Sequence, residues 1–175
     1  KNFCLEKQIS IGKKKYKIYY LNDGKIYMDS SESKYFYIYK NSILPKLSID
    51  IEGIKNSSNI FKYGINKFCK NLNFETVSIV SGRDAKDNYY HWLIDVLPRV
   101  IILESELKKK KNLNLLVPDL NNSYQKESLS CFFKNKQTNF ISLKENKFSK
   151  FKKIVMCSNN ENYEYLNFHL LSKLK

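Results

Sequence analysis

From residue 75 onward, segments with the pattern of a buried strand alternate with segments of helical spacing. The strand patterns are TVSIVSG at 76–82, NLNLLVP at 112–118, NFISL at 139–143 and KKIVMCS at 152–158. The helical patterns cover 88–110, 123–133 and 162–174. Because parallel strands need crossover connections that are usually helical, this alternation predicts an α/β fold with a parallel sheet and packed helices.

The residues before this region have a different, β-rich pattern. Strands are expected at 14–21, 26–30, 34–40 and 42–51, the last at a sheet edge because it contains Pro45. Asn-Asp-Gly between the first two predicts a tight hairpin turn, since it supplies the positive φ that such a turn requires. A connector with a short helix is expected at 55–74. We therefore divide the chain into a β-rich segment, 1–74, and an α/β domain, 75–175.

Lysine dominates the charge of the chain. The formal net charge is +14, from 31 basic and 17 acidic residues, yet only Arg83 and Arg99 are arginines. Proteins that read nucleic acids usually depend on arginine for paired contacts to bases and phosphates. Abundant Lys, Asn and Ile indicate AT-rich coding rather than a binding surface, so we expect no nucleic-acid partner.

The four cysteines and the apolar runs limit which classes of protein remain possible. The cysteines form no C-x-x-C pair and have no histidine at ligand spacing, so we predict buried thiols and no metal site. No apolar run reaches the roughly 18 residues that span a bilayer. We expect a cytoplasmic protein, associated at most peripherally with a membrane. The chain begins at Lys1 and has no Met before Met28, so further residues are expected upstream.

Residues 82–99 collect the rarest residue types of the chain. They include both arginines, the only tryptophan, one of two histidines and one of three prolines. Residues four apart share a helix face, so His91, Asp95 and Arg99 are expected to form one polar stripe, with Asn88 one turn before it. Coding drift does not explain this clustering, and the window is our candidate for a functional site.

Two features place this window in the predicted fold. Pro98 lacks the N–H that would bond to Ile94 and crowds its carbonyl, so the helix is expected to kink or restart there. The strand at 76–82 leads directly into Arg83 and Asp84. Because open α/β sheets bind ligands at the carboxyl ends of their strands, these residues are predicted to lie at the binding edge.

A His–Asp–Arg stripe has a catalytic and a structural interpretation. A carboxylate can orient an imidazole or itself act as a base, and an arginine can hold an anionic group. Such a trio suits deprotonation of a hydroxyl nucleophile. The same spacing also fits a surface ladder worth a few tenths of a kcal/mol per pair, and spacing by itself favours that alternative.

The segment NYYHWLIDVLPRV at 88–100 closely resembles the signature of glycosyltransferase family 61. The resemblance continues less sharply through LLVPDLNNSYQKESL, KIVMCSNN and DGKIYMDS. It implies a GT-B glycosyltransferase with two Rossmann-like domains, of which this chain is the amino-terminal, acceptor-side half. Nothing here is similar to the Arg-rich strand and HGA segment of the family's second half. The chain by itself is therefore expected to be inactive.

The resemblance also implies roles for matching residues. Asp95 and His91 become the catalytic pair, either of which is a candidate general base toward an acceptor hydroxyl. The expected substrate-binding residues are Asn88, Tyr90, Arg99 and Arg83, although aromatic residues are common throughout this chain. The implied reaction transfers a sugar with inversion from a nucleotide sugar, taken to be a UDP-sugar, without a metal or other cofactor.

These features imply an acceptor glycan in capsular or cell-surface polysaccharide synthesis, with the donor bound by the missing carboxyl-terminal half. A second hypothesis is a non-catalytic carbohydrate- or partner-binding module that has lost the donor-binding half. Saturable glycan binding by this chain alone would distinguish this module from a catalytic half.

Overall fold

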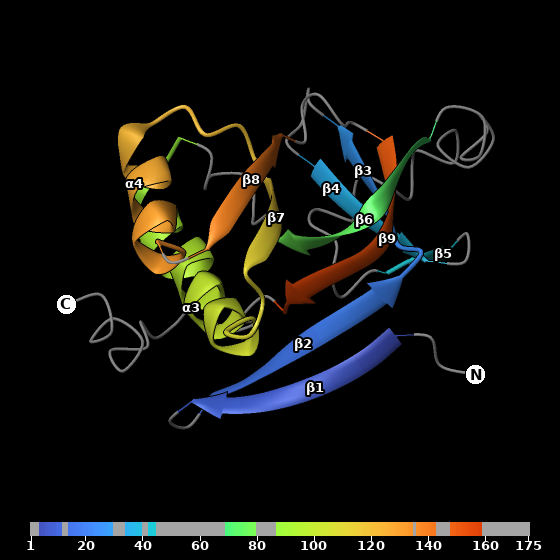
Figure 1. Cartoon of the computed structure of the whole chain (residues 1–175), viewed down its shortest axis with the longest axis horizontal. Coiled ribbons are helices and arrows are strands. Elements are labelled where there is room, and N and C mark those ends of the chain that lie inside the picture. Colours follow the sequence, from blue (N-terminus) through green and yellow to red (C-terminus); the bar gives the residue numbers. More distant parts are fainter. Residues whose placement is uncertain are drawn as a thin grey trace.

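The described residues of the computed structural model form one mixed sheet of nine strands with helices against it (Figure 1). The structure describes residues 4–11, 14–29, 34–39, 42–44, 69–79, 87–134, 136–142 and 148–158. The strands are β1 (Cys4–Ile11), β2 (Lys14–Asn22), β3 (Lys25–Asp29), β4 (Lys34–Tyr39), β5 (Ser42–Ile43), β6 (Lys70–Ser78), β7 (Asn112–Val117), β8 (Gln137–Ser142) and β9 (Phe148–Cys157). The helical elements are α2 (Tyr89–His91), η4 (Trp92–Val96), α3 (Leu97–Glu106) and α4 (Ser123–Phe132).

Four strands run parallel in the order β8-β7-β6-β9. The helix α3 leads from β6 to β7 and α4 leads from β7 to β8, so the predicted alternation with parallel pairing is confirmed here. Only residues 143–147 separate β8 from β9, fewer than the dozen or more that a helical crossover usually needs. The helix predicted at 162–174 lies outside the described residues. None of the described helices is long and apolar enough to cross a membrane.

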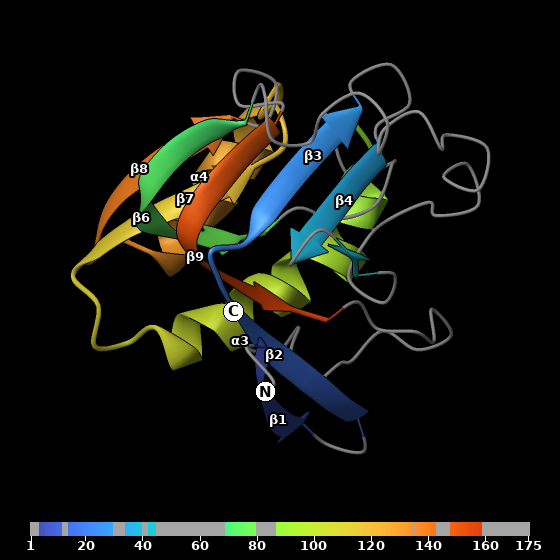
Figure 2. The ribbon, with the colours of Figure 1, turned by 90° about the vertical axis from the view of Figure 1, so that its right-hand side faces the viewer.

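Strand β9 is hydrogen-bonded along both of its edges. One edge pairs in parallel with β6, from Lys70 opposite Ser149 to Ser78 opposite Met156. The other edge pairs antiparallel with β2 over its second half and with β3 over its first half. Figure 2 shows β3 and β4 beyond β9, and the β1–β2 ribbon extending away from the rest of the sheet. Strand β9 therefore joins the parallel and antiparallel parts.

The hairpin predicted around Asn22-Asp23-Gly24 is wrong. Strands β2 and β3 pair with the same edge of β9, one after the other and in the same direction. Asp23 does have a positive φ, 55°. However, its N–H donates to the Lys152 carbonyl at 2.9 Å, and the Gly24 carbonyl accepts from Phe151 N–H at 2.9 Å. Because β9 supplies these bonds, the positive φ bends the strand path without reversing it.

Two other hairpins form in the β-rich segment, β1–β2 and β3–β4. The strand predicted at 34–40 is present as β4. Of the strand predicted at 42–51, the structure describes only β5 and Leu44. The predicted connector at 55–74 ends within β6, which begins at Lys70 and crosses the predicted domain boundary. Described strands from both sides of that boundary thus share one sheet.

Alternating side chains form a buried layer on each face of the sheet. Val77, Leu115 and Val155 face the helices and belong to a cluster with Trp92 and much of α3 and α4. Leu116, Ile154 and Met156 face the other way and pack with side chains of β2, β3 and β4. This alternation follows from the period of two in extended chain, and it buries both faces of β7 and β9.

We expect Asp23→Val to lower the free energy of unfolding by about 1–2 kcal/mol, because a β-branched side chain is strained at positive φ. Urea denaturation of the purified chain would measure this change. Asn22→Val is the matched control at the adjacent exposed position of β2 and should stay within about 0.5 kcal/mol of the parent. Equal stability of the two variants would contradict the bend at Asp23.

Candidate functional site

The helical stretch predicted at 88–110 is observed from Tyr89 to Glu106 as three consecutive segments. Asn88 caps its beginning, where its side-chain oxygen accepts from the N–H groups of Tyr90 at 2.9 Å and His91 at 3.4 Å. Asparagine is among the best residues for this role because it satisfies N–H groups that lack helical acceptors. The predicted substrate-binding residue Asn88 thus has a clear structural role at the start of the site.

The middle segment, η4, is a π-helix, and the α-helix restarts immediately after it. The N–H of Leu97 donates to the carbonyl of Trp92, five residues earlier, and α3 begins at Leu97. Pro98 then occupies one of the first two helical positions, where proline is tolerated. The restart predicted at Pro98 is therefore confirmed. Wide turns of this kind are rare and occur frequently at functional sites.

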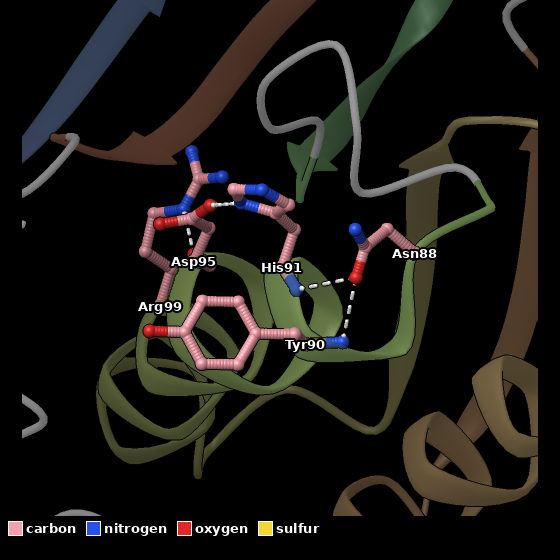
Figure 3. A network of polar contacts seen from close by, with 5 residues as sticks. All are labelled: Asn88, Tyr90, His91, Asp95 and Arg99. Atoms are coloured by element: carbon pink, nitrogen blue, oxygen red, sulfur yellow. Dashed lines mark hydrogen bonds and ion pairs between the residues drawn. The ribbon is translucent and has the colours of Figure 1, made fainter.

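His91 and Asp95 meet across this π-helical turn (Figure 3). Nδ1 of His91 lies 2.9 Å from Oδ2 of Asp95, and the two side chains are 29% and 22% exposed. An ionised carboxylate can only accept a hydrogen bond, so Nδ1 is the donor and the basic lone pair of the imidazole is on Nε2. The pair has the geometry of a histidine base oriented by a carboxylate.

Arg99 completes the polar stripe one helical turn after Asp95. Its Nε donates to the main-chain carbonyl of Asp95 at 2.7 Å, and the residue is only 6% exposed. Figure 3 shows its guanidinium on the same side of the helical stretch as the His91 and Asp95 side chains. The three predicted residues are therefore together, and Arg99 fixes the backbone that carries Asp95. Its predicted contact with substrate remains a prediction.

Three buried side chains near Arg99 were not selected from the sequence. The hydroxyl groups of Tyr37 on β4 and Ser78 at the end of β6 are hydrogen-bonded. Burial raises the pKa of Tyr37 to about 12, and Arg99 opposes this rise. Burial likewise raises the pKa of the Cys157 thiol to about 12, again opposed by Arg99. Ser78 and Cys157 lie at the carboxyl ends of the adjacent strands β6 and β9, and Tyr37 meets Ser78 from β4, which is information that only strand pairing supplies.

The aromatic residues of the motif divide into one anchor and two surface rings. Trp92 is fully buried, and its Nε1 donates to Ser128 Oγ at 3.0 Å, which joins η4 to α4. Tyr89 and Tyr90 are 56% and 57% exposed. The ring of Tyr90 lies 5.7 Å from that of His91 at an interplanar angle of 78°. Trp92 is thus a packing residue, while Tyr90 adjoins the polar pair.

The predicted binding residue Arg83 lies outside the described residues. Among the residues that are described, no group of three or more His, Cys, Asp or Glu side chains could hold a metal ion. Comparisons with protein-family models, with curated proteins and with solved structures found no match to this chain.

The sequence prediction of buried thiols is correct for Cys157 and wrong for Cys131, which is exposed on α4. Iodoacetamide at about pH 8 should therefore alkylate Cys131 and spare Cys157, since the thiolate is the reactive form and burial disfavours it. Peptide mass spectrometry of the folded chain would measure both sites. In urea the two cysteines should react alike, and rapid labelling of Cys157 in the folded chain would contradict its burial.

Proposed function

We propose that this chain is the acceptor-side part of a nucleotide-sugar-dependent glycosyltransferase similar to family 61. The observation that carries the proposal is the His91–Asp95 hydrogen bond of 2.9 Å, made inside the motif on which the family resemblance rests. A surface row of ion pairs could be stabilising without an oriented imidazole, and it would not require a buried arginine and an exposed tyrosine beside that imidazole. The arrangement suits activation of a hydroxyl group better than it suits a stabilising ion pair.

In the proposed reaction, Nε2 of His91 removes the proton from an acceptor hydroxyl. Asp95 holds the imidazole by Nδ1 and stabilises the positive charge that develops on it. The acceptor oxygen forms a bond to the anomeric carbon of the donor as the bond from that carbon to the nucleotide phosphate breaks. The nucleotide leaves with the bonding electrons, and attack from the opposite side inverts the configuration.

The strand order supports a Rossmann-like half of a GT-B enzyme as part of this proposal. Along the chain, the first, second, third and fourth parallel strands are β6, β7, β8 and β9. Across the sheet their order is β8, β7, β6 and β9, that is, third, second, first and fourth. Doubly wound nucleotide-binding sheets begin with this order and bind ligands where it reverses, between the first and fourth strands. Tyr37, Ser78, Arg99 and Cys157 gather near that point, at the carboxyl ends of β6 and β9.

The proposal includes the partners and location that the resemblance implies. The acceptor is a glycan of a capsular or cell-surface polysaccharide, and the donor is a UDP-sugar bound by a carboxyl-terminal half beyond this chain. The enzyme acts in the cytoplasm, with peripheral attachment at the membrane face where lipid-linked acceptors lie. As the resemblance implies, the proposed reaction uses no metal.

The test is Asp95→Asn in the protein encoded by the complete reading frame. We expect sugar transfer to fall by about 10²–10⁴-fold, because the amide no longer holds His91 as a base oriented by a negative charge. Release of nucleotide from the donor in the presence of acceptor glycans would be measured, together with thermal unfolding of the variant.

Glu104→Gln is the charge-matched control, since Glu104 lies on α3 in the same helical stretch and outside the His91–Asp95 pair. It should keep parental transfer. Full activity of Asp95→Asn would remove the pair from catalysis. A complete protein that binds glycans and never releases nucleotide would instead favour the carbohydrate-binding module.

A further inference from the structure

A chain of aromatic rings leads from the protein core to the surface beside the His91–Asp95 pair. Tyr89 meets Tyr124 edge to face, with ring centroids 4.9 Å apart and an interplanar angle of 83°. Tyr124 in turn packs against the buried Trp92, at 6.2 Å and 71°. The Trp92 indole is fixed by its hydrogen bond to Ser128. The outermost ring, Tyr89, is therefore supported by the Tyr124 ring although it is 56% exposed.

This supported ring differs from a tyrosine exposed by chance. A side chain that is already ordered loses little conformational entropy when it binds a ligand, so its contact contributes more to affinity. Aromatic rings offer a flat apolar face, and tyrosine adds a polar tip. Tyr89 and Tyr90 are the two most exposed large apolar side chains among the described residues, and they are adjacent in sequence.

Amide and carboxylate residues lie just before Tyr89 and Tyr124 in the chain. Asn121 Nδ2 donates to Asp87 Oδ1 at 3.3 Å, which joins the segment after β7 to the beginning of α2. Asn122 Nδ2 lies 3.5 Å from the Tyr124 hydroxyl. Such planar groups donate and accept hydrogen bonds in pairs, as vicinal hydroxyl groups of a sugar require. An apolar face beside these groups matches the two kinds of surface on a sugar ring.

The charge of these segments indicates a neutral ligand. The chain has 31 Lys and Arg residues in 175, yet neither 87–98 nor 112–125 contains one. The same segments include Asp87, Asp95 and Asp119. Phosphates and nucleic acids are bound through basic side chains, and Arg99, which follows the first segment, is only 6% exposed, so the two segments favour a neutral ligand over an anionic one.

We propose that Tyr89 and Tyr124 form a second subsite, which binds a neutral sugar unit next to the one that Tyr90 and His91 accept. The inference rests on the proposed function and extends it: the acceptor is a neutral oligosaccharide of at least two units. Adjacent residues at the start of α2 direct Tyr89 toward Tyr124 and Tyr90 toward His91, so the two rings serve different units.

The experiment is an NMR chemical-shift titration of the whole 175-residue chain with neutral sugars. The probes are xylose with xylotetraose, glucose with cellotetraose and maltotetraose, and N-acetylglucosamine with chitotetraose. At least one tetrasaccharide should bind more tightly than its monosaccharide. Tyr89→Ala should lower the affinity for that tetrasaccharide about fivefold and leave the affinity for the monosaccharide unchanged. Tyr89→Phe keeps the ring and should keep both affinities.

Phe140→Ala is the matched control, because Phe140 is an exposed aromatic residue on β8, outside this subsite. It should change neither affinity, and thermal melting should show that all variants fold. Equal affinity for tetrasaccharide and monosaccharide, or no binding by any probe, would overturn the second subsite. If a sulfated heparin tetrasaccharide bound more tightly than the neutral probes, and this binding disappeared in salt, the inference that the ligand is neutral would be overturned. The proposed function is judged separately, by nucleotide release in Asp95→Asn.

Discussion

The pairing of β9 along both edges is the constraint on which the rest of the structure depends. Among the described strands, β9 alone pairs both with a parallel strand, β6, and with the antiparallel strands β2 and β3, so it places these strands in one sheet. Its register with β6 brings Ser78 and Met156 side by side and sets the edge at which Arg99 and Cys157 gather. The local geometry of the candidate site thus depends on hydrogen bonds far from its own helix.

Within that frame, the site is held by groups that take no part in the proposed chemistry. Asn88 fixes the beginning of the helical stretch, Trp92 anchors it to α4, and Arg99 supports the carbonyl of Asp95. Pro98 cannot donate to the preceding turn, and the π-helical turn before it accommodates this loss. Positioning groups of this kind hold the proposed catalytic pair in one geometry, which is what proton transfer requires.

Features set by local sequence could be predicted, whereas features set by distant pairing could not. Helical spacing placed His91 and Asp95 on one face, and alternating apolar residues identified β7 and β9. Asn22-Asp23-Gly24 was misread because a positive φ is compatible with both a hairpin and a bend, and the choice depends on β9. Tyr37 was missed for the same reason, since only the assembled sheet brings β4 to Ser78.

The central place of β9 also has a consequence for biosynthesis. Strand β9 is the last described strand to leave the ribosome, and β2, β3 and β6 all pair with it. Residues that are hydrogen-bonded near its end, such as Lys17 and Ser158, lie 141 positions apart in the chain. Contacts between such distant residues slow folding, and unpaired strand edges promote aggregation while they wait. The nascent chain therefore carries open edges on β2, β3 and β6 until β9 is made, so the sheet is complete only late in translation.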